Sequence, residues 1–377
     1  MSFSFGFTGD DISDDEQNSS TVKPTAPAPA ATGSAFPVPG KPQLPPTVHQ
    51  LSDLLAQQPS KIAYSLLDVT LDDGTTVQLP RRELWDVRVQ LMAEEEDVAG
   101  AQSEGLGSHD VKTGVYEGGF KSWESSVDLV KVLASNKAIS TLEQKAFRVI
   151  EVSEVVHVCS VLYLTLYQQL GCGTALPSLA VFHWAVTSKT ERKPLSLIMA
   201  DYNPSVLQLV TLPNFILSWA LNNTQLPALQ EAFSIEGEVE LGPDVIAAFQ
   251  KFLEESHITL SFVSGAWSQE FVDLLYTLPS GNGQPSSTLL LGAETIYSPF
   301  ALQAFLETLF LVLERERDTE GSEAGAYIGA KRMYFGVGGS LDDFVDKARQ
   351  KGAQVEQLRE ESEGVRRGVV QCLLGST

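Results

Sequence analysis

The stretch Leu170–Phe182 combines closely spaced glycines with an apolar helical pattern, and such a combination can hold a nucleotide. Gly171 and Gly173 carry no Cβ, so the backbone can turn tightly there and approach a ligand closely. Apolar residues follow at helical spacing, which predicts a helix whose free N–H groups point back at the turn. Ala175 stands where a third glycine would be expected, so an ordinary connection between two elements remains the alternative to a nucleotide cradle.

Polar and aromatic residues end the next three predicted strands. Asp201 ends the strand 195–201, where its carboxylate could accept hydrogen bonds from both hydroxyls of a ribose or could cap the following helix. Gly265–Trp267 closes the strand 258–264 with a backbone amide and an indole that could reach an adenine ring. Ala293–Tyr297 ends the strand after that. Because the carboxyl ends of parallel strands meet at one edge of a sheet, we expect these groups to form one nucleotide site.

The remaining reactive residue types do not form a competing site. The five histidines are scattered without the spacing of metal ligands, and no cysteine or carboxylate partners stand at suitable offsets. The chain has neither the glycine-rich loop of P-loop ATPases nor the G-x-S-x-G turn of serine hydrolases. The sequence therefore disfavours a metal site, ATP hydrolysis and serine-based hydrolysis.

From Val111 onward, apolar strands alternate with amphipathic helices, which is the pattern of a parallel sheet covered on both faces. The last two predicted strands have no room for a helix between them, so we expect the sheet to end antiparallel. The predicted fold is therefore α/β and Rossmann-like, with seven strands. The predicted strands are 147–151, 195–201, 258–264, 288–297, 326–335, 354–360 and 368–374. The predicted helices are 123–134, 175–186, 205–221, 243–255, 299–316 and 341–351.

The N-terminal part of the 377-residue chain differs in composition from the rest. Residues 1–47 are rich in Asp, Ser, Thr, Pro, Ala and Gly and cannot bury enough apolar area to offset the entropy of ordering, so we expect a disordered tail. Residues 48–110 are predicted to be an N-terminal extension and linker that contains a β-hairpin turning at Asp73 and Gly74. Residues 111–377 form the predicted main domain.

The chain is acidic, with 48 acidic and 26 basic residues and a formal net charge of −22. This excess disfavours nucleic acid as a partner and favours a basic protein. The cysteines Cys159, Cys172 and Cys372 cannot form a disulfide framework and are interpreted as reduced thiols. No N-terminal apolar signal is present, and the longest apolar run, Val155–Tyr167, is too short to span a bilayer. We expect a monomeric protein of the cytoplasm and nucleus that contacts neither membranes nor nucleic acid.

Seven phrases of the sequence are distinctive, namely GVYEGGFKSWESSVDL, FRVIE, LGCGTALPSL, ADYNPSVLQLVTLPN, SGAWS, LLLGAETIYSP and AKRMYFGVGGSLDDF. Together they resemble the eukaryotic protein-histidine methyltransferases, from about Gly114 to the C-terminus. The resemblance implies a class I methyltransferase sheet of seven strands with S-adenosylmethionine as the cofactor. It also implies methyl transfer to an imidazole nitrogen of a histidine, with large-subunit ribosomal protein number three as the substrate. A basic target fits an acidic enzyme.

The same resemblance implies roles for individual residues. Trp123 and Glu124 would line the methionine end of the cofactor. Asp201 would hold the ribose, and Ala266 and Trp267 would flank the adenine. The full set of implied cofactor-binding residues is Trp123, Glu124, Gly171, Gly173, Asp201, Asn203, Gly265, Ala266, Trp267 and Ala293.

Two catalytic residues are implied at the end of the strand 288–297. Glu294 and Tyr297 form a Glu-x-x-Tyr that is similar to the Asp/Glu-x-x-Tyr/Phe signature of related protein-lysine methyltransferases. Glu294 could accept a hydrogen bond from the second ring nitrogen of the acceptor histidine and fix its tautomer, with Tyr297 stacking or hydrogen bonding. Capping of the following helix is the alternative role of Glu294. Lysine methylation on the same fold and cofactor-independent binding of a basic ribosomal partner are the alternative functions.

The chain departs from the family pattern at one place. In the family the first strand runs directly into the glycines, whereas here Val152–Gln169 stands between Glu151 and Leu170. Either 162–168 replaces FRVIE as the central strand, or FRVIE keeps its position and the inserted residues loop out. We expect the first, because exposing an apolar loop of this size is costly. A third hypothesis is a retained intron, since Val-Ser is codable as a splice donor and Gln as an acceptor, and removal restores the family phrase in frame.

Overall fold

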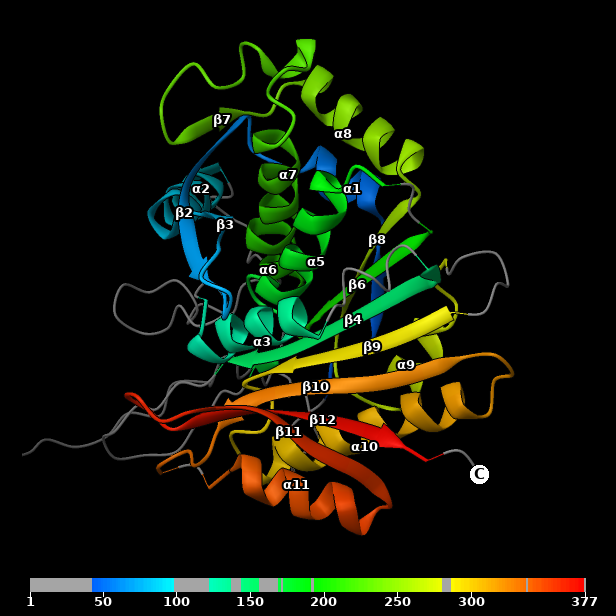
Figure 1. The fold of residues 1–377 in the computed structure, drawn as a ribbon. Helices are drawn as coiled ribbons and strands as arrows, with labels where there is room; N and C mark the ends of the chain where they lie inside the picture. Colours follow the sequence, from blue (N-terminus) through cyan, green and yellow to red (C-terminus); the bar gives the residue numbers. More distant parts are fainter. Residues whose placement is uncertain are drawn as a thin grey trace, which may run out of the picture. The chain divides into compact units, whose positions relative to one another are not determined.

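The computed structural model describes residues 43–97, 122–136, 144–155, 169–170, 172–190, 193–279, 286–336 and 338–375, all in one compact unit of the chain. The predicted disordered tail up to residue 42, the predicted linker from residue 98 and Gly171 lie outside these residues. Within the described ranges, a mixed β-sheet carries helices on both faces, and a small antiparallel sheet lies beside it (Figure 1).

The main sheet confirms the predicted fold class. Its strands are β1 Thr47–His49, β4 Ala146–Val155, β5 Gln169–Leu170, β6 Leu195–Asp201, β8 Ile258–Ser264, β9 Ser286–Ala293, β10 Glu323–Lys331, β11 Ala353–Glu361 and β12 Arg367–Leu374. They lie in the order β1-β8-β6-β4-β9-β10-β12-β11, with β5 paired to the end of β4. The strands from β8 to β10 are parallel, and β12 is antiparallel to both β10 and β11. The seven predicted strands and the antiparallel ending are all present.

The strand order places a ligand crevice at the centre of the sheet. From β4 the chain moves outward to β6 and β8, and then returns to add β9 on the other side of β4. In open α/β sheets, ligands bind at the carboxyl ends of the strands next to such a reversal. The central strands can occupy this position because they are apolar on both faces, and every residue of β6 is buried.

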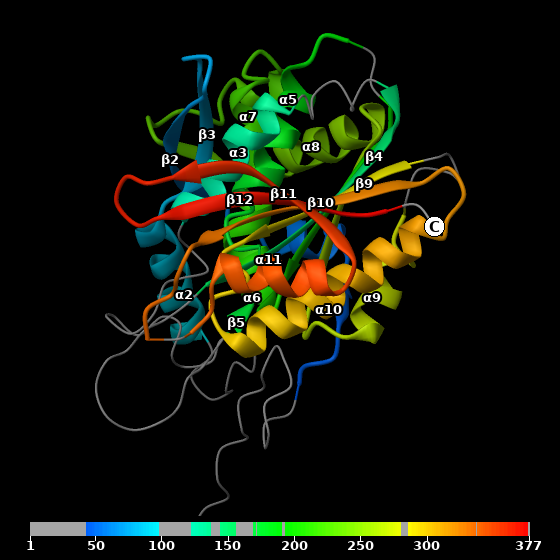
Figure 2. The same cartoon turned by 60° about the horizontal axis from the view of Figure 1, so that its bottom comes forward.

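Two layers of helices cover the sheet, as Figure 1 and Figure 2 show from two directions. One core contains side chains of α3 Glu124–Ser135, α5 Leu176–Thr187, α7 Leu212–Leu221 and α8 Pro243–Glu255. The other contains side chains of α9 Gln269–Leu275, α10 Pro299–Arg317 and α11 Leu341–Gln350. The last three helices begin at serine N-caps, whose hydroxyl accepts a hydrogen bond from the backbone N–H three residues later. α9 was not predicted, because its seven residues are too few to show a helical period.

The helical stretch before β8 contains an irregular turn. α6 Pro204–Val206 leads into a π-helical turn, Leu207–Thr211, and then into α7. Among the described residues, Pro204–Leu221 is the one helix long and apolar enough to cross a membrane, but 78% of that window is buried inside the protein, as in a core helix. π-helical turns are frequent at functional sites, because they shift the side chains that follow.

The N-terminal extension supplies two of the three strands of the small sheet, and the segment before α8 supplies the third. The strands are β2 Lys61–Thr70, β3 Thr76–Arg82 and β7 Glu238–Glu240, in the order β3-β2-β7. The predicted hairpin between β2 and β3 is confirmed, with Gly74 at φ 83° and the Asp73 carboxylate accepting the Thr75 N–H at 2.9 Å. Two helices flank it, α1 Leu51–Ala56 and α2 Leu84–Asp97, and α2 was not predicted.

The expectation that 162–168 would supply the central strand is wrong. FRVIE lies in β4, paired in parallel with β6 on one side and β9 on the other. Arg148 explains why this segment keeps the position, because its buried guanidinium donates to the Thr288 hydroxyl on β9 and to the Glu316 carboxylate on α10. β4 continues to Val155, and the chain returns as β5, which pairs antiparallel with Glu154 and Val155. The residues between them lie outside the described part of the chain.

Two predicted strands extended too far. β9 ends at Ala293 rather than residue 297, because Glu294 has a left-handed backbone with φ 58° that turns the chain out of the sheet. β10 ends at Lys331 rather than residue 335. In the tight loop that follows, the Tyr334 N–H donates to the Gly339 carbonyl, and the Tyr334 carbonyl accepts the Gly338 N–H. Both errors fall at the carboxyl edge, where the chain leaves the sheet to build a site.

Candidate active site

The glycine turn before α5 has the geometry of a cradle. Gly173 has φ 54° and Ala175 has φ 50°, so the position where a third glycine was expected does adopt the left-handed conformation. This conformation costs an alanine roughly 1 kcal/mol and persists only where surrounding contacts hold it. Two side chains supply those contacts. The Thr211 hydroxyl donates to the Gly173 carbonyl at 2.6 Å, and the Asn214 amide donates to the Thr174 carbonyl at 3.1 Å.

Asp201 lies next to this turn, at the carboxyl end of β6. Its Oδ2 accepts the Gly173 N–H at 3.1 Å, and its Oδ1 accepts the Asn203 N–H at 2.9 Å. Its backbone carbonyl accepts the N–H of Gly265, at the end of β8, at 3.3 Å. Four of the residues predicted to bind the cofactor therefore converge on one point, although they come from three separate segments.

The predicted adenine edge is covered by the N-terminal segment. Ala266 and Trp267 are buried, and the Ala266 N–H donates to the Leu44 carbonyl at 3.0 Å. Gly265, at φ 113°, lies so close to this segment that a Cβ would be 2.5 Å from the Pro45 carbonyl oxygen. β1 then continues antiparallel to β8. An adenine that uses the Ala266 amide would have to replace the Leu44 carbonyl.

Glu294 is the centre of a second group, at the carboxyl ends of β9 and β10. Its buried carboxylate accepts hydrogen bonds from the Ser125 hydroxyl and, at 2.6 Å, from the Tyr334 hydroxyl. The Lys331 Nζ lies 4.0 Å from the same carboxylate. Burial raises the pKa of Glu294, and the opposing attraction of Lys331 and the two hydroxyls keeps the rise smaller. A strained, buried carboxylate at a strand end is typical of functional sites.

Aromatic rings surround this carboxylate. The Lys331 ammonium lies 5.3 Å from the ring centroid of Trp123 and 5.6 Å from that of Tyr334. Tyr297 and Tyr334 pack edge to face with their ring centroids 6.4 Å apart. Trp123 and Tyr297 therefore lie beside the Glu294 group, whereas the side chain of Glu124, which the resemblance places with Trp123 at the methionine end of the cofactor, is exposed at the start of α3.

A hydroxyl pair joins the two groups. Ser122 precedes α3, and its Oγ lies 3.2 Å from the Thr174 Oγ1 in the glycine turn. Ser125, three residues later, donates a hydrogen bond to the Glu294 carboxylate. The start of α3 therefore contacts both the glycine turn, through Ser122, and the Glu294 carboxylate, through Ser125. Of the predicted cofactor-binding and catalytic residues, those that the structure describes thus lie along one edge of the sheet.

A second buried carboxylate, Glu151, lies beneath the glycine turn. Its Oε2 accepts the Ser178 N–H, in the first turn of α5, at 2.7 Å. Its Oε1 has no hydrogen-bond partner among the described residues. Burial raises the pKa of Glu151 to about 7, and the hydrogen bond from the Ser178 N–H opposes this rise. Although Val152–Gln169 separates Glu151 from the glycines in the sequence, Glu151 contacts the start of the helix that follows the turn.

The residues present fit the nucleoside half of S-adenosylmethionine. A carboxylate can accept up to about four hydrogen bonds, so Asp201 is suited to ribose hydroxyls while two backbone N–H groups hold its orientation. The left-handed turn at Gly173 allows close approach of a ligand to the backbone. An adenine can accept a hydrogen bond from the Ala266 N–H only after the Leu44 carbonyl has moved away.

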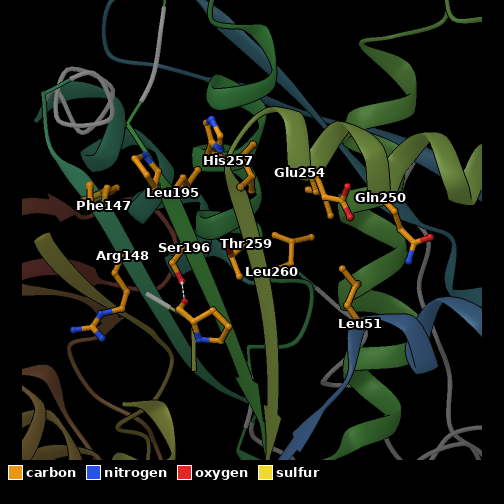
Figure 3. Close-up of a pocket in the computed structure, with 15 residues that line it drawn as sticks. Leu51, Phe147, Arg148, Leu195, Ser196, Gln250, Glu254, His257, Thr259 and Leu260 are labelled. Carbon is orange, nitrogen blue, oxygen red and sulfur yellow. Dashed lines mark hydrogen bonds between the residues drawn. The ribbon is translucent and has the colours of Figure 1, made fainter. Parts of the chain in front are cut away.

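A separate pocket of about 420 Å³ lies at the opposite edge of the sheet (Figure 3). It is lined by the amino ends of β4, β6 and β8, including Phe147, Leu195 and Leu260. The guanidinium of Arg148 at its border already donates to Thr288 and Glu316. No group of three metal-ligating side chains occurs among the described residues. The described residues of this pocket therefore offer no alternative to the carboxyl edge as the reactive site.

Sequence reasoning missed five residues that build this site. Thr211 and Asn214 belong to the phrase TLPN, which was quoted as a family marker but given no role. Ser125, Lys331 and Tyr334 also lie in quoted phrases. Their spacing carries no signal, since the hydroxyls that meet at Glu294 come from residues 169 positions before it and 40 positions after it.

Several known proteins are similar in sequence to most of this chain. The chain is 33% identical to "Histidine protein methyltransferase 1" of Saccharomyces cerevisiae, over 91% of this chain and 89% of the relative. It is 30% identical to the Schizosaccharomyces pombe protein of the same name, over 78% of this chain and 74% of the relative. A Bos taurus homologue is 26% identical, over 73% of this chain and 59% of its own length.

The other comparisons add little. No protein-family model matches the chain. A solved methyltransferase from Pyrococcus furiosus aligns with 77% of this chain and 98% of its own, with 12% identity and a TM-score of 0.29, too low to bear on the assignment. The two yeast relatives span most of the chain at 30% identity or more, and on that ground the chain belongs to the histidine protein methyltransferase 1 family.

Proposed function

We propose that this chain transfers a methyl group from S-adenosylmethionine to an imidazole nitrogen of a histidine in a protein. The observation that carries the proposal is the connection, through Ser122 and Thr174, of a nucleoside cradle to the buried Glu294 group. The names of the yeast relatives support histidine as the acceptor. The net charge of −22 supports a basic substrate, for which we propose large-subunit ribosomal protein number three. We place the reaction in the cytoplasm and nucleus and expect a monomer.

The chemistry asked of the protein is mainly positioning. S-adenosylmethionine supplies a methyl group already activated by its sulfonium, so a neutral imidazole needs only alignment and a place for its second ring proton. Asp201 would hold the ribose, and the indole of Trp267 would pack against the adenine. Glu294 would hold the Tyr334 hydroxyl in place and accept a hydrogen bond from the acceptor ring, which fixes the neutral tautomer with its other nitrogen free.

Glu294→Ala tests the role of this carboxylate. We expect the dissociation constant for S-adenosylmethionine to stay within about twofold and turnover to fall by roughly 10²- to 10⁴-fold, the usual size of a proton-handling contribution. Glu294→Gln is the matched control, because it retains the shape and one acceptor oxygen and should lose less. Turnover of the alanine variant equal to that of the unchanged protein would refute the role.

One observation favours a second candidate function, namely binding of a basic ribosomal partner without catalysis. The Leu44 carbonyl already accepts the hydrogen bond from the Ala266 N–H, which is the donor that an adenine would use. Calorimetry with S-adenosylmethionine distinguishes the two functions, because a pure binding protein would show no heat of cofactor binding. Mass spectrometry of methylated ribosomal proteins then decides between histidine and lysine as the acceptor, since fragments locate the added methyl group.

A further inference from the structure

Three large apolar side chains are exposed beside the Glu294 group. Phe300 is 57% exposed, Met333 is 56% exposed and Phe335 is 81% exposed. Phe300 follows Tyr297 at the start of α10, and Met333 and Phe335 flank Tyr334 in the loop after β10. Since β9 and β10 are adjacent parallel strands (Figure 1), the segments that carry these side chains leave the sheet side by side. We call these three residues the apolar rim.

Backbone hydrogen bonds join the segments that carry the rim beside the candidate site. The Gly339 N–H donates to the Tyr297 carbonyl at 2.8 Å, and the Tyr334 N–H donates to the Gly339 carbonyl at 3.0 Å. A Cβ on Gly339 would lie 2.1 Å from the Ile296 carbonyl oxygen, so the two segments pack backbone to backbone. In the loop, Tyr334 points inward to Glu294 while its two neighbours are exposed. Large apolar side chains exposed to water beside such a site are typical of an interaction surface.

We infer that the apolar rim docks the polypeptide on either side of the acceptor residue, and that it selects a substrate segment with an apolar side chain among basic ones. This inference rests on the proposed function, because it uses the same site. The preference for an apolar side chain in the substrate follows from the three exposed side chains of the rim. The preference for basic side chains follows from the excess of 48 acidic over 26 basic residues in the chain and from the exposed carboxylate of Glu124 at the start of α3, whereas the carboxylates of Asp342 and Asp343 already pair with Arg332 and Lys347.

The experiment compares Phe335→Ala and Met333→Ala with Ile235→Ala. Ile235 is the matched control, because it is 52% exposed and precedes β7 in the small sheet, away from β9 and β10. The substrate is unmethylated large-subunit ribosomal protein number three, and a histidine-containing dipeptide serves as a small acceptor. We expect KM for the protein to rise about tenfold in each rim variant, the loss that follows when a large side chain is no longer buried on docking. The cofactor dissociation constant and the rate with the dipeptide should not change.

Binding of the ribosomal protein without cofactor, measured by fluorescence anisotropy, gives a second readout. The inference predicts weaker binding to the rim variants than to Ile235→Ala. Equal KM and equal binding in all variants would overturn the inference while leaving the proposed methylation intact. If the unchanged protein methylates nothing but binds the ribosomal protein through the rim, the proposed function fails and the docking surface stands.

Discussion

Glu151→Gln tests whether burial of the charged carboxylate under the glycine turn lowers the free energy of unfolding. Glu151 is 1% exposed, and one backbone N–H satisfies only one of its oxygens. Glutamine has the same shape and can accept the same hydrogen bond from Ser178, but it carries no charge at any pH. The substitution therefore removes the cost of burying the charge and leaves the packing unchanged.

The magnitude follows from the pKa of Glu151. Burial raises this pKa from 4.5 to about 7 in the folded protein, so between these values the folded state binds a proton that the unfolded state has lost. The contribution of Glu151 to the free energy of unfolding is then largest at low pH and is lost as the pH rises through about 7. One pKa unit corresponds to about 1.4 kcal/mol, which gives a total loss of about 3 kcal/mol. About 2 kcal/mol of it falls between about pH 5.5 and 7.

Urea denaturation of both proteins at several pH values from about 5.5 to 8.5 measures this effect. The difference in unfolding free energy, variant minus unchanged protein, should increase by about 2 kcal/mol over this range and reach a plateau above pH 7.5 or so. Glu363→Gln, at an exposed glutamate between β11 and β12, is the control and should show no comparable increase. A difference that stays flat with pH would refute the reasoning about Glu151.

Three further predictions concern the same edge of the sheet. A variant without residues 1–46 should bind S-adenosylmethionine more tightly by calorimetry, because the Leu44 carbonyl no longer occupies the Ala266 amide; weaker binding would contradict this reading. Gly339→Ala should abolish methylation and lower the melting temperature, since its Cβ would overlap the backbone at Ile296, whereas Gly242→Ala, with open space around its Cβ and an ordinary φ of −70°, should keep its activity. Transcript sequencing should find messages in which codon 151 joins codon 170. A protein lacking Val152–Gln169 should bind the cofactor more tightly, because Glu151 then leads directly into the glycine turn. Uninterrupted reads through every transcript would dismiss the retained intron.

The sequence by itself determined the strands of the main sheet from β6 onward and most of the helices that cover them. Continuous apolar runs marked β6 and β8 with the bounds 195–201 and 258–264, because a parallel strand covered on both faces has no polar side. α8 at 243–255 was likewise predicted from its periodicity. These signals are local, since the pattern of a buried strand or an amphipathic helix is complete within a few turns of chain. The family phrases added the expected site residues.

Tertiary structure decided which segments meet. The choice of FRVIE as the central strand depended on Arg148 reaching Thr288 and Glu316, and the occupation of the Ala266 amide by Leu44 depended on the path of the N-terminal segment. The partners of Glu294 were also invisible in the sequence, because a buried carboxylate takes whichever hydroxyls the fold brings within reach. Such contacts join residues far apart in the chain, and no local pattern encodes the distance between them.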